Sequence, residues 1–115
     1  MQAYVVGKVT VAAAGTPVRL PALPISYGSN GLVARIDFSA PSSMAGASVF
    51  VGQFGTLVKA TGVGVFKELM KPTAAAFSDE YSTPELCEGN TIDPQFFAVD
   101  AATSADGPYV VYWVN

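Results

Sequence analysis

The sequence predicts an all-β protein, folded as an antiparallel β-sandwich or jelly-roll-like barrel of about seven to nine short strands. Two observations predict this fold class. Apolar residues recur at every second position in most segments, which is the period of a strand with one buried face. Gly, Pro, Ser and Asn interrupt these segments at intervals of about 8–12 residues, as turns do in small sandwiches. The chain has the length of one domain, so residues 1–115 are expected to form a single β-sandwich domain.

The expected strands of the first half follow from this alternation. A strand over 4–11 places its odd-numbered residues on one face, and a short strand over 18–20 is stopped by the proline that follows it. The strand over 32–39 is the clearest, because its apolar even-numbered positions alternate with odd-numbered ones that include Arg35 and Asp37. This strand is therefore expected to have one face in water.

The second half offers further strand candidates at 48–51, 57–60, 62–65, 66–70, 95–100 and 109–114. The last two are rich in aromatic and β-branched residues, which pack well on a pleated surface. Residues 66–70 also fit one helical turn, and the pattern leaves that choice open. Because the first and last expected strands are both strong, the two ends of the chain are expected to lie in sheets.

The usual catalytic groups are scarce, since the chain contains no histidine and a single cysteine, Cys87. Histidine is the common proton shuttle near neutral pH and the commonest metal ligand. Cys87 has no partner for an internal disulfide. No basic residue follows Lys71 to activate it as a nucleophile, so we interpret it as a small apolar filler. We therefore expect no catalytic residue, no metal site and no cofactor, and we do not expect an enzyme.

Carboxylates are the only remaining catalytic material, and five of them gather between residues 78 and 93: Asp79, Glu80, Glu85, Glu88 and Asp93. A paired-carboxylate hydrolase would need two of them facing a sugar-sized cleft. A Ca²⁺ site would suit their oxygens, although the spacing matches no calcium-binding loop. The favoured interpretation is a solvated acidic loop.

The net charge of −3 is unevenly distributed. All six basic residues lie within 1–71 together with two acids, whereas 72–115 contains seven acids and no base. One interpretation is that opposite patches meet between identical subunits or on a partner. The other, which we favour, is pairing within the fold together with solvated loops. The negative total disfavours binding to nucleic acid, and no apolar run reaches the ~20 residues of a membrane span.

Three aromatic residues are candidates for a partner interface. Phe54 lies in a glycine-bounded segment, and Phe77 and Tyr81 lie in or beside the acidic stretch 78–93. Exposed aromatic side chains commonly anchor protein partners. The alternative, which we favour, is that these rings plug the open ends of a small sandwich.

Four stretches of the chain resemble small virion structural proteins of tailed bacteriophages. They are Val6–Val11, Ala14–Leu20 with a Gly-Thr-apolar-polar-Leu turn, Ala47–Gly52 with an apolar-aromatic-Val-Gly strand, and Gln95–Ala101, which ends in Asp-Ala. Proteins of this type are β-sandwiches or jelly rolls that decorate or cement capsids, or that form parts of tails and fibres. The resemblance carries over no catalytic residue.

This resemblance implies a capsid decoration or cement subunit on the capsid exterior of the virion, with the major capsid protein as its partner. It also implies a homo-oligomer, with a trimer favoured over a dimer. Only 13% of the residues are charged, about half the usual share, and such a neutral surface suits subunit contacts. The start of the chain resembles no targeting peptide, so we expect it to be made soluble in the host cytoplasm. The alternative is a receptor- or carbohydrate-binding β-module of a phage tail, baseplate or fibre.

Overall fold

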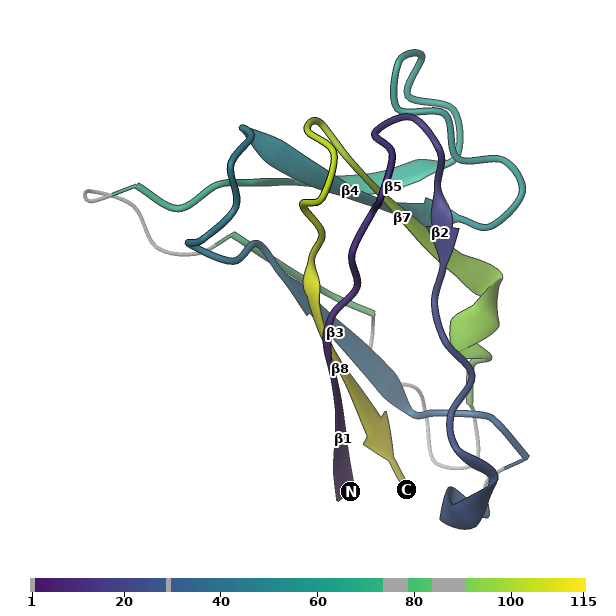
Figure 1. The fold of residues 1–115 in the computed structure, drawn as a ribbon. Coiled ribbons are helices and arrows are strands. Elements are labelled where there is room, and N and C mark those ends of the chain that lie inside the picture. Colours follow the sequence, from purple (N-terminus) through teal and green to yellow (C-terminus); the bar gives the residue numbers. More distant parts are fainter. Residues whose placement is uncertain (1, 29, 74–78, 84–90) are drawn as a thin grey trace.

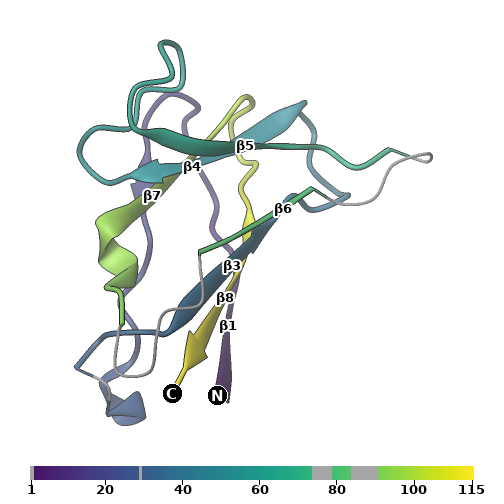
Figure 2. The same ribbon diagram turned by 180° about the vertical axis from the view of Figure 1, so that it is seen from behind.

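The computed structural model describes residues 2–28, 30–73, 79–83 and 91–115, and this part of the chain is all-β. Its eight strands form two four-stranded antiparallel sheets, which make the two layers seen in Figures 1 and 2. Sheet A has the order β1-β8-β3-β6, and sheet B has the order β2-β7-β4-β5. The strands are β1 (Gln2–Lys8), β2 (Val18–Arg19), β3 (Arg35–Ser39), β4 (Ser48–Gln53), β5 (Val65–Met70), β6 (Glu80–Ser82), β7 (Phe97–Ala101) and β8 (Tyr109–Val114). The expected antiparallel β-sandwich is confirmed.

The strands pair as they do in a jelly roll. β1 pairs with β8, β2 with β7, β3 with β6 and β4 with β5, each time antiparallel. One long hairpin, which turns between β4 and β5, therefore wraps around the core, and its successive strand pairs fall alternately in sheets A and B. The two ends of the chain lie side by side in sheet A, where Gln2 pairs with Val114 (Figure 1).

The hydrophobic core lies between the two sheets. Its fully buried members include Ile36, Phe38, Val110 and Tyr112 from sheet A, and Val49, Val51, Leu69 and Val99 from sheet B. On β3 the alternation holds as predicted, because Ile36 and Phe38 face the core while Arg35 and Asp37 face outward. The hydroxyl of Tyr112 donates to the carbonyl of Pro21 at 2.6 Å. Burial raises the pKa of Tyr112 above its usual value, so this donor stays protonated.

The first strand corrects one expectation. Its register with β8 shifts between Val5 and Gly7, which marks a β-bulge, and Gly7 adopts a φ of 84° that favours glycine. Before the bulge, Tyr4 and Val6 pack against the core and Val5 is 55% exposed, whereas beyond it Val9 is buried. The prediction that Val5 and Val9 share one face was therefore wrong, because the extra residue of the bulge reverses the alternation.

Three other segments are settled by the structure. Residues 66–70 belong to a strand, β5, and not to a helical turn. Residues 57–60 form turns with a single bridge between Val58 and Val63 instead of a strand. The 3-10 helix η2 (Pro94–Phe96) replaces the start of the strand expected at 95–100, because the carboxylate of Asp93 accepts from the amide of Gln95 at 2.9 Å and Pro94 opens the turn. A second 3-10 helix, η1, spans Ile25–Tyr27. Within the described ranges, no helix has the length and apolarity needed to cross a membrane.

Candidate functional site

Exposed aromatic side chains gather at one end of sheet B. Phe54 follows β4, Phe66 lies in β5 and Phe96 ends η2, and their side chains are 45%, 42% and 49% exposed. Arg19 of β2 lies at the same end of the sheet, since it pairs with Ala98, the second residue of β7. We call these four residues (Arg19, Phe54, Phe66 and Phe96) the aromatic patch. Aromatic residues and arginine are the side chains most enriched at protein interfaces.

The rings of the aromatic patch are held in place by one another and by the core. Phe66 stacks on Phe96 with 6.5 Å between ring centroids, and both rings contact the buried Phe97 edge-on at 5.8 and 5.5 Å. The guanidinium of Arg19 lies 4.2 Å from the centroid of the Phe54 ring. The amide of Phe54 donates to the carbonyl of Phe96 at 2.8 Å, and this hydrogen bond links the Arg19–Phe54 pair to the Phe66–Phe96 pair. A partner would therefore meet a surface that is already ordered and that loses little side-chain entropy on binding.

The structure separates the three aromatic residues singled out from the sequence. Phe54 belongs to the aromatic patch and is exposed. Tyr81 of β6 is only partly exposed, and its ring packs on Phe38 with 5.9 Å between centroids, so it closes one side of the sandwich. Phe77 lies outside the described residues. Sequence reasoning missed Phe66 and Phe96, and the adjacent pair Phe96-Phe97 carried the usable signal, since neighbours in a strand face opposite ways.

The described carboxylates of the acidic stretch do not converge on one site. Asp79 accepts from the amides of Met70 and Glu80, whereas Asp93 caps η2. The two residues lie beside opposite ends of β3. The backbone carbonyl of Asp79 accepts from the amide of Ala40, just after β3, whereas Ile92, the neighbour of Asp93, forms a bridge with Val33 before β3. They are therefore ~20 Å apart at about 3.3 Å per strand residue. Glu85, Glu88 and Cys87 lie outside the described residues.

The aspartates of the second half bond mainly to backbone amides. Among the described residues, one ion pair is present. It joins Arg35 to Asp37, and both residues belong to the basic first half. Asp79, Asp93, Asp100 and Asp106 each accept from at least one backbone N–H. In the described residues, these aspartates of the second half therefore act mainly as caps of turns and loops.

Asp106 makes the most complete of these contacts. Its Oδ1 accepts from the amide of Ala45 at 2.8 Å and its Oδ2 accepts from the amide of Gly46 at 2.7 Å, which holds the loop before β4. Burial by itself would raise the pKa of Asp106, but the two amide donors, helped by Lys8 and Lys71, lower it below the usual 3.8. We call Asp106 with Ala45 and Gly46 the carboxylate clasp. It lies at the end of sheet B opposite the aromatic patch, because β4 runs from one to the other.

The outer face of sheet A is organised around Asp37. Its Oδ1 accepts from the hydroxyl of Ser82 at 2.7 Å, and its Oδ2 accepts from the indole Nε1 of Trp113 at 2.7 Å. The guanidinium of Arg35 pairs with the same carboxylate at 3.1 Å and lies 5.0 Å from the centre of the Trp113 ring. Both oxygens of Asp37 are occupied within the chain, so this carboxylate acts as a structural hub that stiffens the sheet.

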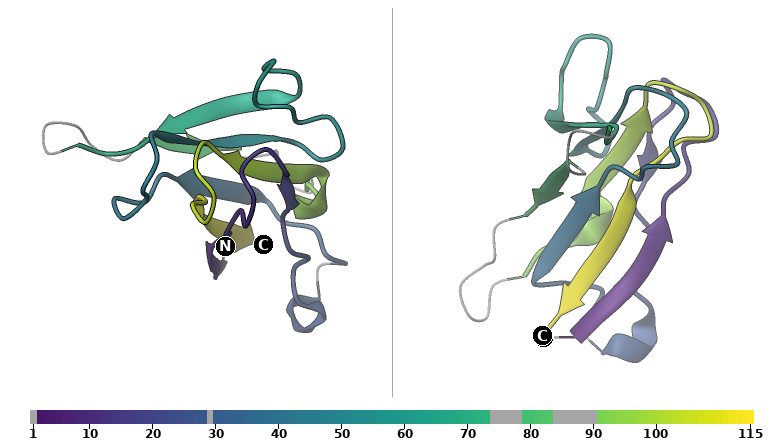
Figure 3. Two further views of the ribbon diagram at one scale, coloured as in Figure 1. Left: turned by 45° about the horizontal axis from the view of Figure 1, so that its top comes forward. Right: turned by 90° about the vertical axis from the view of Figure 1, so that its left-hand side faces the viewer.

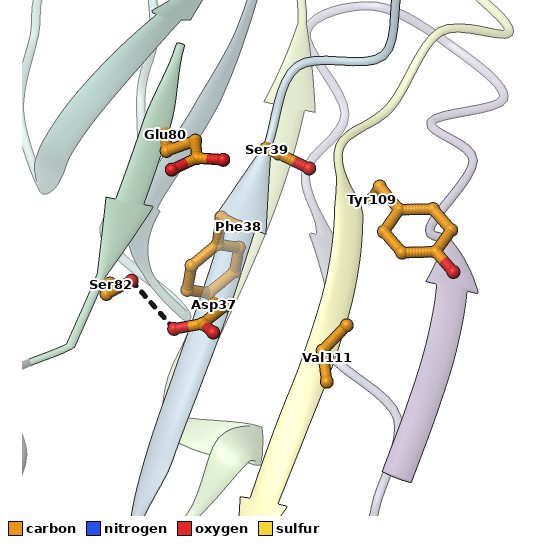
Figure 4. A pocket seen from close by; sticks show the side chains of 7 residues that line it. All are labelled: Asp37, Phe38, Ser39, Glu80, Ser82, Tyr109 and Val111. Carbon is orange, nitrogen blue, oxygen red and sulfur yellow. Dashed lines mark hydrogen bonds between the residues drawn. The ribbon is translucent and has the colours of Figure 1, made fainter. Parts of the chain in front are cut away.

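A shallow depression of about 250 Å³ lies beside this hub (Figure 4). The strand register aligns Tyr109, Ser39 and Glu80 in one row across β8, β3 and β6, and Lys8 of β1 extends that row. Val111, Asp37 and Ser82 form the next row. In Figure 4 the Tyr109 ring and the Glu80 carboxylate lie on the two sides of the depression, with Ser39 between them.

Three of the four stretches that carry the resemblance lie next to one another in sheet B. They contain β2, β7 and β4, which are neighbours in the sheet. Asp100 of β7 pairs with Phe50 of β4, and its Oδ1 accepts from the amide of Gly15, in the turn before β2, at 3.0 Å. The Gly-Thr turn and the Asp-Ala strand end are therefore joined by a partly buried hydrogen bond.

Comparisons with known proteins add no identification. The chain matches no protein-family model, no curated protein and no solved structure. Among the residues that the structure describes, no group of three or more His, Cys, Asp or Glu side chains is placed to hold a metal ion.

Proposed function

We propose that this protein is a structural subunit of a bacteriophage virion, a capsid decoration or cement protein that binds the major capsid protein on the outside of the shell. The aromatic patch is the observation that carries the proposal. Three half-exposed rings and an arginine, fixed by their mutual contacts, offer apolar area and a cation to a protein partner. The jelly-roll fold and the resemblance to phage virion proteins support the same assignment.

In this proposal the protein acts by bridging. A subunit that contacts two coat proteins adds buried area at their joint, and a contact of about 1,600 Å² is the usual size of a specific interface. Repeated over a shell, such contacts stabilise the assembled state relative to free coat subunits. Stiffness favours this role, because a bridge that bends does not hold its two contacts together.

The test mixes the purified chain with particles that lack it and follows rupture on heating. We expect the chain to bind assembled shells, to bind isolated coat protein weakly, and to raise the rupture temperature. Failure to bind, or binding without a change in rupture temperature, would contradict the cement role.

The depression on sheet A favours a second candidate function, the binding of a carbohydrate receptor by a module of a tail, baseplate or fibre. A sugar could place an apolar face on the Tyr109 ring while Ser39 and Glu80 bond to its hydroxyls. Adjacent strands are about 4.8 Å apart, a spacing that lets a short glycan follow the row. NMR titration with a panel of oligosaccharides tests this: we expect shifts at Tyr109 and Ser39 that Tyr109→Ala removes and Phe54→Ser leaves intact.

A further inference from the structure

We propose that strand β1 is a self-association site: the free edge of β1 pairs antiparallel with β1 of a second copy and joins two copies of sheet A across a twofold axis. The inference concerns the isolated protein and does not depend on the virion role proposed above.

The edges of the two sheets are not equivalent. Among the described residues the edge strands are β1 and β6 in sheet A, and β2 and β5 in sheet B. An edge strand presents backbone N–H and C=O groups that can pair with another chain. Proteins commonly block such edges by short length, charged side chains, proline or bulges.

Three of these edges carry such blocks. β2 has two residues and lies between Pro17 and Pro21. β6 has three residues and begins with Glu80. β5 carries the exposed charges of Lys67 and Glu68, and its register with β4 breaks at a bulge.

The edge of β1 lacks these blocks over its first part. From Gln2 to Val6 it contains no charge and no proline, and its bulge and its lysine come afterwards, at Gly7 and Lys8. Val5 projects outward with 55% of its side chain exposed. The right-hand view of Figure 3 shows β1 as the outermost strand beside β8, with no described strand on its other side.

The comparison of the four edges also indicates which strand would pair with β1. A row of edge backbone groups is matched in register by another extended strand, and in a second copy the other described edges are blocked, so β1 is the strand that fits. Antiparallel pairing of identical strands is twofold. If the neutral segment pairs with itself about Tyr4, Val5 lies opposite Ala3 of the second copy and each Lys8 lies past the end of the paired segment. No like charges then meet across the twofold axis.

This geometry also defines the expected oligomer. A twofold edge pair gives a dimer, which replaces the trimer that we expected from the resemblance. A single strand pair lies at the small end of specific interfaces, so we expect weak, reversible and concentration-dependent association.

Sedimentation of the isolated chain over a wide concentration range tests the inference. We expect a monomer–dimer equilibrium in the unmodified protein and a monomer in the Ala3→Lys/Val5→Lys variant, since each new lysine faces another across the pair. The Ala3→Glu/Val5→Glu variant should also be monomeric, and mixing the two variants should restore the dimer. The matched control is Val63→Lys, at a valine that is 56% exposed in the loop between β4 and β5, and it should dimerise like the unmodified protein.

The contrary outcomes are equally defined. A monomer at all concentrations, a threefold species, a dimer that survives the lysine variant, or variants that do not recombine would each overturn the proposal. Because the variants could fold poorly, intermolecular NOEs in a mixed-label sample of the unmodified protein provide an independent measurement. Contacts between β1 backbone protons of two copies are expected, and a dimer without them would overturn the proposal.

Discussion

The two ends of sheet B differ in how their side chains are satisfied. At the start of β4, the carboxylate clasp places a buried aspartate between two amide donors, so each of its oxygens accepts a hydrogen bond within the chain. At the far end, the aromatic patch holds three rings that remain about half exposed. The first end maintains the fold, and the second is the surface that we propose binds a partner. Substitutions at the clasp should therefore reduce stability, and substitutions at the patch should reduce binding.

The largest effect on stability is expected at the clasp. In Asp106→Asn, an amide group of the same size replaces the carboxylate. Its NH2 group is a donor, and it faces a backbone N–H from which the carboxylate oxygen had accepted a hydrogen bond. The free energy of unfolding should therefore fall by about 2 kcal/mol. Asp79→Asn is the matched control, because Asp79 also accepts from two amides but in an exposed position. Urea denaturation of both variants measures the difference. Equal losses would remove the distinction between a buried clasp and an ordinary surface cap.

The clasp should also give the protein an acid-sensitive component of stability. The pKa of Asp106 in the folded protein lies below its usual 3.8, so the ionised carboxylate stabilises the fold above that value. This contribution is lost as the pH falls from about 3.8 through the lower folded pKa. The stability difference between the unmodified protein and Asp106→Asn should thus be constant near neutral pH and shrink in acid. A difference that grows as the pH falls would contradict this assignment.

The smallest effect on stability is expected at the aromatic patch. Phe54→Ser removes a half-exposed ring and its contact with Arg19, so the loss should stay below about 1 kcal/mol. Thermal unfolding followed by circular dichroism provides the measurement. A loss as large as that of the clasp variant would mean that Phe54 supports the fold, which is the plugging role that we favoured from the sequence.

The fold was more predictable than the site, and particular residues show why. On β3, Arg35 and Asp37 mark the outer face, so alternation alone gives the orientation correctly. On β1, the bulge between Val5 and Gly7 depends on the register with β8, which lies at the other end of the sequence. A glycine within a strand hints at such a bulge, but it does not say which residues turn inward.

The aromatic patch shows the same limit. Phe54 stood out because glycines lie close to it on both sides, whereas Phe66 and Phe96 lie in segments whose sequence is typical of ordinary strands. Which of Phe96 and Phe97 faces outward is decided by the end of η2 and by the pairing of Phe97 with Gln53. These are contacts between distant segments, and the local pattern does not contain them.

The most direct test of the central claim compares shell binding and folding in the same variants. The Phe54→Ser/Phe96→Ser protein and the control Ile25→Ser, whose isoleucine on η1 is 97% exposed, would be titrated onto particles that lack the subunit. Loss of an interface anchor costs about 2 kcal/mol or more. We therefore predict at least a ~30-fold weaker affinity for the patch variant and normal binding of the control. The patch variant should lose some stability with its ring contacts but remain folded at the temperature of the titration. Undiminished binding of the patch variant to the shell would contradict the account.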